Sequence, residues 1–337
     1  MSYASGQTIL RDEYNIFATG AAAGTATNSG NINNIWGAGN GDSGYGQGTT
    51  LSAVSTGNTV AANEWANMVA RMDSIRKHQS NTAYTPGSGP NPIVTGGTIT
   101  AVSDLSSTLS TLYTNRLTYY AQGTNATSTT VAATWNSATP TTFTIVRTFT
   151  FADENSARYF FNAGGQIGIT FTTANAADTD KEIKMAELIA SVGTHYLRAR
   201  SCTRSGTGNT QTTFNSSTGY YDLTTSDVTY LKLTEDTAPY TSNTIDIKWK
   251  TNATNASGLS GNGNIITCTI VLTENATDDF NDAFNFSITT TSNITPPETT
   301  YLTNVWGTPT VVSSVATSTP GYNVTYLVVA GGGGGGY

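Results

Sequence analysis

One stretch of the chain, residues 142–172, constrains the fold more than any other. In its first part, apolar side chains fall on alternate positions with threonines between them, at Phe143, Ile145, Phe149 and Phe151. A period of two with β-branched residues between is typical of a strand with one buried face. The alternation returns at Ile167, Ile169 and Phe171. The sequence therefore predicts a core built on β-strands.

Two short helices are predicted beside these strands. Asp153 can cap a helical turn that Gly164-Gly165 ends. Further along, Thr179 and Glu182 have the spacing of a capping box, and Gly193 is placed to end the helix. One apolar face supports this second helix, formed by Met185, Leu188, Ile189 and Val192.

The remainder of residues 129–330 also has a β pattern. Short strand-like runs separated by Asn, Gly and Ser occur at 194–201, 229–233, 244–250, 265–273, 284–290, 311–315 and 323–330. This pattern predicts a mainly β fold with sandwich or jelly-roll-like domains.

Residues 1–85 have a different, helical character. A helix is predicted at 62–78, with one apolar stripe made by Trp65, Met68, Val69, Met72 and Ile75. His78 is interpreted as a cap or surface residue, because no second metal ligand is near it in the sequence. Residues 86–97 are rich in Pro and Gly and are predicted to be a linker.

A second helix, at 103–122 within the region 98–125, leaves two interpretations open. Its apolar residues step by three and four positions in a heptad-like seam that Arg116 interrupts, and they are Leu105, Leu109, Leu112 and Tyr119. The seam predicts either a short helical neck in a trimer or a helix packed on its own domain.

Composition narrows the classes of function. A chain of 337 residues predicts two or three domains. Charged residues make up 11%, and 15 Lys plus Arg with a net charge of −7 argue against nucleic-acid binding. No apolar run is long enough to span a membrane, and the first residues do not resemble a signal peptide, so synthesis in a cytoplasm is expected. The two cysteines are then expected to be reduced structural thiols.

The sequence offers no convincing catalytic, cofactor or metal site. It contains no nucleophile elbow, phosphate loop or cluster with metal-ligand spacing. Adjacent carboxylates occur at Asp153-Glu154, Glu235-Asp236 and Asp278-Asp279. Two carboxyl groups at a set distance could cleave glycans, but neighbours on a strand point in opposite directions. They are interpreted as surface charges, and the protein is not expected to be an enzyme.

Three segments carry a resemblance to a known class of protein. They are residues 31–47 with 59–65 and 78–79, then 161–171 with the helix to Gly193, and finally 326–336. They resemble virion structural proteins of tailed phages, cyanophages among them, and the last segment resembles the glycine-rich start of distal tail-fibre modules. The glycine-rich residues 331–337 also lead us to expect that the natural chain continues.

The resemblance implies a tail-fibre or baseplate-attached protein in the virion, often a homotrimer. Its N-terminal region would dock on other tail or baseplate proteins, and its β-rich part would extend toward a host glycan or protein. Three aromatic residues are candidate anchors for this docking: Trp36, Tyr45 and Trp65. All three could instead belong to an ordinary small core, and Trp65 in particular opens the apolar stripe of its helix. A head fibre or capsid decoration protein and a glycan-binding or glycan-cleaving module are the alternatives.

Overall fold

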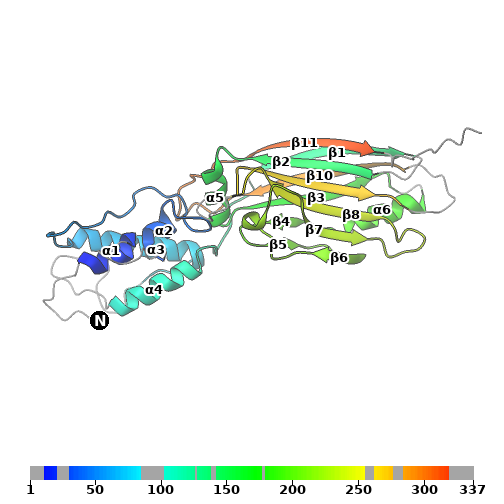
Figure 1. Cartoon of the computed structure of the whole chain (residues 1–337). Helices are drawn as coiled ribbons and strands as arrows, with labels where there is room; N and C mark the ends of the chain where they lie inside the picture. Colours follow the sequence, from blue (N-terminus) through cyan, green and yellow to red (C-terminus); the bar gives the residue numbers. More distant parts are fainter. Residues whose placement is uncertain are drawn as a thin grey trace, which may run out of the picture.

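The structure is a computed structural model that describes residues 11–20, 30–84, 102–125, 127–137, 142–176, 179–254, 262–275 and 284–318. The described residues up to 125 form a helical region at one end, and those from 127 to 318 form a β region at the other (Figure 1). The predicted linker at 86–97, the strand at 323–330, the glycine-rich tail and Asp278-Asp279 lie outside the described residues.

The elements follow one another in a helical series and then a mainly β series. The helical region contains α1 (Arg11–Thr19), α2 (Ile32–Trp36), α3 (Ala62–Ser80) and α4 (Val102–Thr114). The first half of the β region contains β1 (Thr127–Ser137), β2 (Thr142–Thr150), α5 (Glu154–Asn162), β3 (Gln166–Ala174), α6 (Asp180–Ala190), β4 (His195–Leu197) and β5 (Cys202–Arg204). The second half contains β6 (Thr210–Phe214), the 3₁₀ turn η1 (Tyr220–Asp222), β7 (Val228–Thr234), β8 (Thr244–Thr251), β9 (Ile265–Thr273), β10 (Phe284–Thr295) and β11 (Thr310–Ser318).

The β region consists of two antiparallel sheets. One has the strand order β1-β10-β3-β4-β5, and the other has the order β11-β2-β9-β8-β7-β6. The prediction of a mainly β fold is therefore confirmed, while the jelly-roll-like assignment stays a prediction. The two alternating stretches of the sequence become β2 and β3, which lie in different sheets with α5 between them in the chain.

The two sheets meet through their buried faces. Alternate residues of β2 are buried, as a strand with one face on a core requires. Trp135 of β1 stacks on Phe143 of β2 with 5.4 Å between ring centroids, and it also stacks on Phe284 of β10 at 4.4 Å. Because β2 belongs to one sheet and β1 and β10 to the other, these rings join the two layers.

The predicted helix caps are confirmed in part. The Asp153 carboxylate accepts a hydrogen bond of 2.7 Å from the Ser156 N–H, and the Thr179 hydroxyl accepts one of 3.2 Å from the Glu182 N–H. These bonds satisfy N–H groups that a helix start leaves without partners. The Glu182 carboxylate does not complete a capping box. It accepts instead from the Asn285 N–H at 2.7 Å and so attaches α6 to β10.

In the helical region, α3 confirms the helix predicted at 62–78. Its whole apolar stripe is buried. The second helix is shorter than predicted, because α4 ends at Thr114 rather than 122. There the chain turns, with the Thr118 N–H bonded to the Asn115 carbonyl at 2.8 Å. This turn brings the Tyr120 N–H to 2.9 Å from the His78 carbonyl on α3.

Several titratable side chains lie in the core. Arg147 sits on the buried face of β2, where its guanidinium donates to the Ser313 hydroxyl of β11 and to the Thr290 carbonyl of β10. Burial lowers the pKa of Arg147. Cys202 and Cys268 are buried free thiols, as expected, and burial raises the pKa of Cys202 to about 12.

Both histidines are buried, and the interpretation of His78 as a surface or cap residue is wrong. The His78 ring lies edge-on to Tyr45, 5.0 Å away, and burial lowers the pKa of His78 to about 4. His195 lies among Phe171, Tyr230 and Trp249. Burial lowers its pKa to about 3, and neither of its ring nitrogens has a hydrogen-bond partner among the described residues.

These histidines predict a loss of stability in mild acid. The unfolded chain takes up protons at histidine near pH 6.5, whereas the folded chain does so only below about pH 4, so the free energy of unfolding should fall as the pH drops from 6.5 to 4. Urea unfolding at a series of pH values across this range measures the effect. The His195→Phe variant should show a shallower slope; an unchanged slope would contradict the assignment.

Candidate functional site

The most organised polar site of the described chain lies where the helical region meets the β region. Its centre is the segment 37–48 that follows α2, called the junction loop below. Glycine is required at several of its positions, of which Gly44 and Gly46 contact other parts of the site. At Gly44, with φ of +90°, a Cβ would lie 2.3 Å from the Ala38 carbonyl oxygen, and at Gly46 it would lie 2.3 Å from the Tyr159 ring. The loop is therefore tightly coiled and pressed against α5.

Two side chains of α5 bind the backbone of the junction loop. Arg158 donates to the carbonyls of Gly41 at 3.1 Å and Ser43 at 2.9 Å, and also to Ala38. Asn162, one helical turn later, donates to Gly41 at 3.3 Å, Ser43 at 3.1 Å and Gly44 at 3.0 Å. Both side chains are buried. They satisfy a group of carbonyls that the glycine-rich loop directs inward and away from water.

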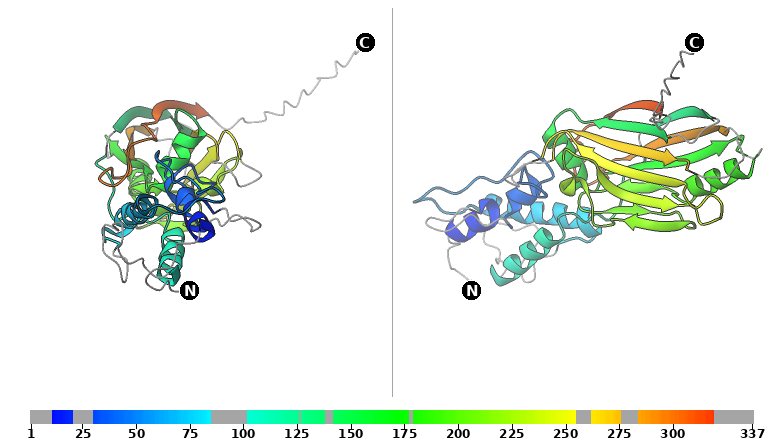
Figure 2. Two further views of the ribbon diagram at one scale, coloured as in Figure 1. Left: turned by 90° about the vertical axis from the view of Figure 1, so that its left-hand side faces the viewer. Right: turned by 45° about the vertical axis from the view of Figure 1, so that its right-hand side comes forward.

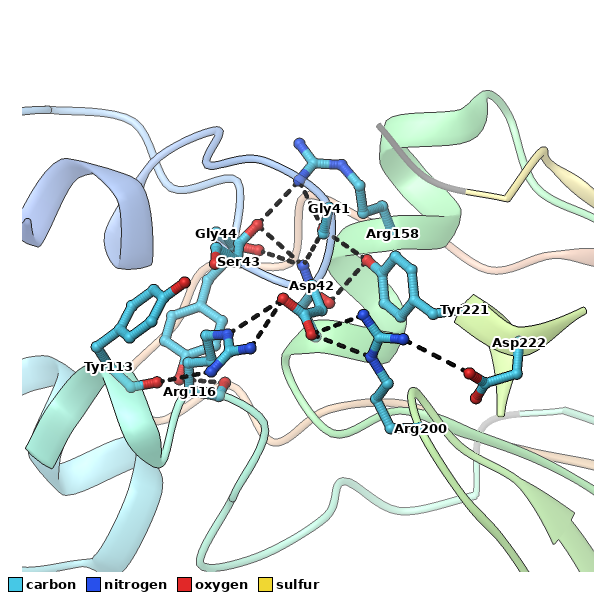
Figure 3. A network of polar contacts seen from close by, with 12 residues as sticks. Gly41, Asp42, Ser43, Gly44, Tyr113, Arg116, Arg158, Arg200, Tyr221 and Asp222 are labelled. Carbon is cyan, nitrogen blue, oxygen red and sulfur yellow. Dashed lines mark hydrogen bonds and ion pairs between the residues drawn. The ribbon is translucent and has the colours of Figure 1, made fainter. Parts of the chain in front are cut away.

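An ionic network surrounds these bonds, as Figure 3 shows. The Asp42 carboxylate lies 2.9 Å from Arg116, which follows α4, and 2.9 Å from Arg200, which lies between β4 and β5. Arg200 is half-exposed, so its pair adds little stability, while the Arg116 pair is more enclosed. Tyr221 donates to the Gly41 carbonyl at 2.7 Å, and burial raises its pKa well above the ordinary value.

Tyr45 connects the junction loop to the helices. Its hydroxyl donates to the Arg116 carbonyl at 2.8 Å and accepts from the Gln79 amide of α3 at 3.1 Å. The same Gln79 amide donates to the Leu112 carbonyl of α4 at 2.8 Å. Burial raises the pKa of Tyr45, so it stays a neutral donor. One tyrosine thus fixes the loop against both long helices.

The three predicted anchor residues lie inside the chain's own core, which corrects the expectation that they insert into a partner. Tyr45 and Trp65 are fully buried, and Trp36 is 6% exposed. The Trp36 indole N–H donates to the Gly48 carbonyl at 2.9 Å, and the guanidinium of Arg71 lies over the ring at 4.7 Å. All three aromatic rings are therefore core residues of the small helical region.

The predicted neck residues are also covered by their own chain. Leu105, Leu109 and Leu112 are buried, and α4 packs beside α3 and α2. The interpretation of a helix packed on its own domain is the correct one for this seam. Tyr119 lies beyond the end of α4 and covers Gly164, where a Cβ would stand 2.2 Å from the Tyr119 ring. The sequence could not reveal this, because a heptad seam looks the same whether its partner helix is in the same chain or another.

Little in the described residues indicates catalysis. They contain no cluster of His, Cys, Asp and Glu that could hold a metal. Of the paired carboxylates, Asp153 caps α5, and the hydrogen bond from Ser156 lowers its pKa. The interpretation of Glu235 as a surface charge is wrong, because it is buried and accepts from the Thr237 N–H at 3.2 Å. Two hollows of about 330 and 500 Å³ open on the helical region, and only the larger has a carboxylate in its lining, that of Glu64.

In comparisons with protein-family models, curated proteins and solved structures, no match to this chain is found. Over the described ranges, none of the helices combines the length and apolar character needed to cross a membrane.

The junction predicts that the Asn162 amide contributes to the stability of the contact between the two regions. Asn162→Asp replaces a donor facing three carbonyls by an acceptor, and it should lower the free energy of unfolding by about 2–3 kcal/mol. It should also expose the junction loop to limited proteolysis. Asn58→Asp makes the same change of charge at an exposed position and should leave stability within about 0.5 kcal/mol of the parent. Equal effects of the two variants would argue against the assigned role.

Proposed function

We propose that this chain is a structural component of a phage tail, either a tail fibre or a baseplate-attached protein, and that it has no catalytic role. In this proposal the helical region docks on other tail proteins, and the β region extends toward the host surface. The chain acts as one of several copies in the virion, a homotrimer being the expected assembly.

The observation that carries the proposal is the contact between two segments that resemble phage virion proteins. Residues 31–47 and 161–171 are more than a hundred positions apart, yet Asn162 of the second segment binds three carbonyls of the first. Gln79, from the short matching piece 78–79, binds Tyr45 in the same place. Residues that resemble one family in separate pieces thus meet in one structural site, as a shared architecture requires.

The contact between the helical and β regions also suits a protein whose two regions keep a fixed orientation, rather than one that opens and closes. Buried apolar side chains of the helical and β regions form one continuous cluster, from Tyr14 to Trp306. Gln47 adds a paired bond to the segment before β11, since its amide donates to the Thr303 carbonyl at 3.0 Å and accepts from the Thr303 N–H at 2.7 Å. A docked helical region would therefore fix the direction of the β region.

The direct test is to locate the chain in the particles of the virus that encodes it. Mass spectrometry of purified virions should detect the chain, and a cryo-EM reconstruction should place its helical region against the tail and its β region outward. Asn162→Asp introduced into the viral gene should lower the occupancy of this position by weakening the joint, whereas Asn58→Asp should not.

The alternatives give different results in the same experiments. Density for the chain on the capsid would favour a head fibre or decoration protein. Release of reducing sugars from host polysaccharide by the purified chain would favour a glycan-cleaving module. Absence of the chain from the particles would overturn the proposal.

A further inference from the structure

The two borders of the β region differ in how well their edge strands are protected. At one border lie β5, of three residues, and β6, of five, and the pairing of β6 with β7 is interrupted by a bulge between Gln211 and Thr213. Short and bulged edges resist pairing with further strands. At the other border lie β11, of nine residues, and β1, of eleven, side by side (Figures 1 and 2). Both of these strands keep a continuous register with their neighbours.

Exposed apolar side chains gather at this second border. Among the described residues the large hydrophobic side chains that are exposed are Tyr120, Val305, Val312 and Val315. Two of the four lie on β11, where Val312 is 65% exposed and Val315 38%, and Val305 lies shortly before that strand. Among the described strands β11 is paired only with β2, so its other edge has no described partner. An edge strand with exposed valines is a template for another strand.

The exposed surface of the same border carries no charge, because the Arg147 guanidinium that contacts Ser313 of β11 is buried. Neither β11 nor β1 contains Asp, Glu, Lys or Arg. On the outer face of the sheet, Val312 lies opposite Thr148 of β2, which in turn lies opposite Thr267 of β9. The first charged side chains across this face are on β8, at Asp246, Lys248 and Lys250. Charged side chains normally prevent a sheet edge from pairing with further strands. On this face they begin only at β8, which β2 and β9 separate from β11.

We infer that the border formed by β11 and β1 is the surface through which copies of this chain assemble, with the free edge of β11 paired to a strand of a second copy. Val312 and Val315 lie in this contact. The inference deepens the assembly part of the proposed function but does not depend on a place in a phage tail. It also moves the contact between copies away from the leucines of α4, which the chain covers itself.

Charge favours a second copy as the occupant. Two copies with a net charge of −7 each repel one another over most of their surfaces, and the repulsion is least where neither carries a charge. A strongly basic or acidic partner would find no complement on this border. Backbone pairing requires only a second free edge, and among the described strands this border supplies two, β11 and β1. Identical chains can therefore pair β11 with β11 in a dimer or β11 with β1 around a closed trimer.

The oligomeric mass tests the inference. In gel filtration with light scattering, the full chain should give two or three times 35.3 kDa at micromolar concentration. Val312→Lys brings like charges together at the contact and should weaken association by about tenfold or more. Gln211→Lys adds the same charge to the edge strand of the other border and should leave the mass unchanged. A parent chain that stays monomeric at all concentrations, or equal behaviour of the two variants, overturns the inference.

A crosslinking experiment gives a second measurement that does not require weakening the contact. Ser314 is exposed on β11, and both native cysteines are buried, so a cysteine placed there is the accessible thiol. Ser314→Cys should yield covalent oligomers with a short bis-maleimide, and Gln211→Cys should not. If both variants keep the oligomeric mass of the parent and only Gln211→Cys crosslinks, the contact lies on the other border and the inference is refuted. The result is independent of whether the chain is found in virions.

Discussion

The capture of backbone carbonyls by α5 is the interaction on which the arrangement of the two regions depends. A glycine-rich loop can coil tightly, but coiling directs several carbonyls to one side, and burying them without donors costs free energy at each one. Arg158 and Asn162 supply donors for four carbonyls between Ala38 and Gly44. The guanidinium has a fixed fork of donors, and the amide has two, so the loop can bind in only one register. This fixes α2 and α3, which flank the loop, relative to the sheets.

Charged residues are scarce in this chain, and paired hydrogen bonds from amide side chains connect distant segments in place of ion pairs. An amide side chain binds both the N–H and the carbonyl of one distant residue, as a neighbouring strand would. Asn15 holds Val54 with bonds of 3.0 and 2.8 Å, Asn33 holds Leu51 with two of 2.8 Å, and Gln47 holds Thr303. Such pairs are neutral, so salt does not screen them and burial carries no penalty for a full charge. Each pair fastens a segment that forms no strand of its own.

Local patterns in the sequence predicted local structure well, and contacts between distant segments poorly. The alternation at Phe143–Phe151, the caps at Asp153 and Thr179 and the stripe of α3 depend on neighbours in sequence, and the structure contains them all. The full length of β1 was not predicted, because Thr, Ser and Ala in its sequence give no clear period. Arg147 falls in phase with the buried apolar residues of β2, so its place in the core could have been predicted. Its polar partners on β10 and β11 could not, because they lie more than a hundred positions away.

In the candidate site, the residues that carry the proposed resemblance to phage proteins contact other parts of the same chain. They therefore determine the arrangement of the two regions rather than the binding of a ligand. The polar groups of the junction loop face α5, α3 or the turn after α4, and the tyrosine that looked like an anchor is a buried donor within the chain. These contacts constrain the residues of the junction loop, and they determine how the helical region is attached to the sheets. Surfaces that meet other molecules must then lie where the chain leaves its own groups uncovered, and among the described strands β11 carries the exposed valines of an unprotected edge. A fixed joint and an edge that no described strand covers are the two features that the proposed structural role in an assembly requires.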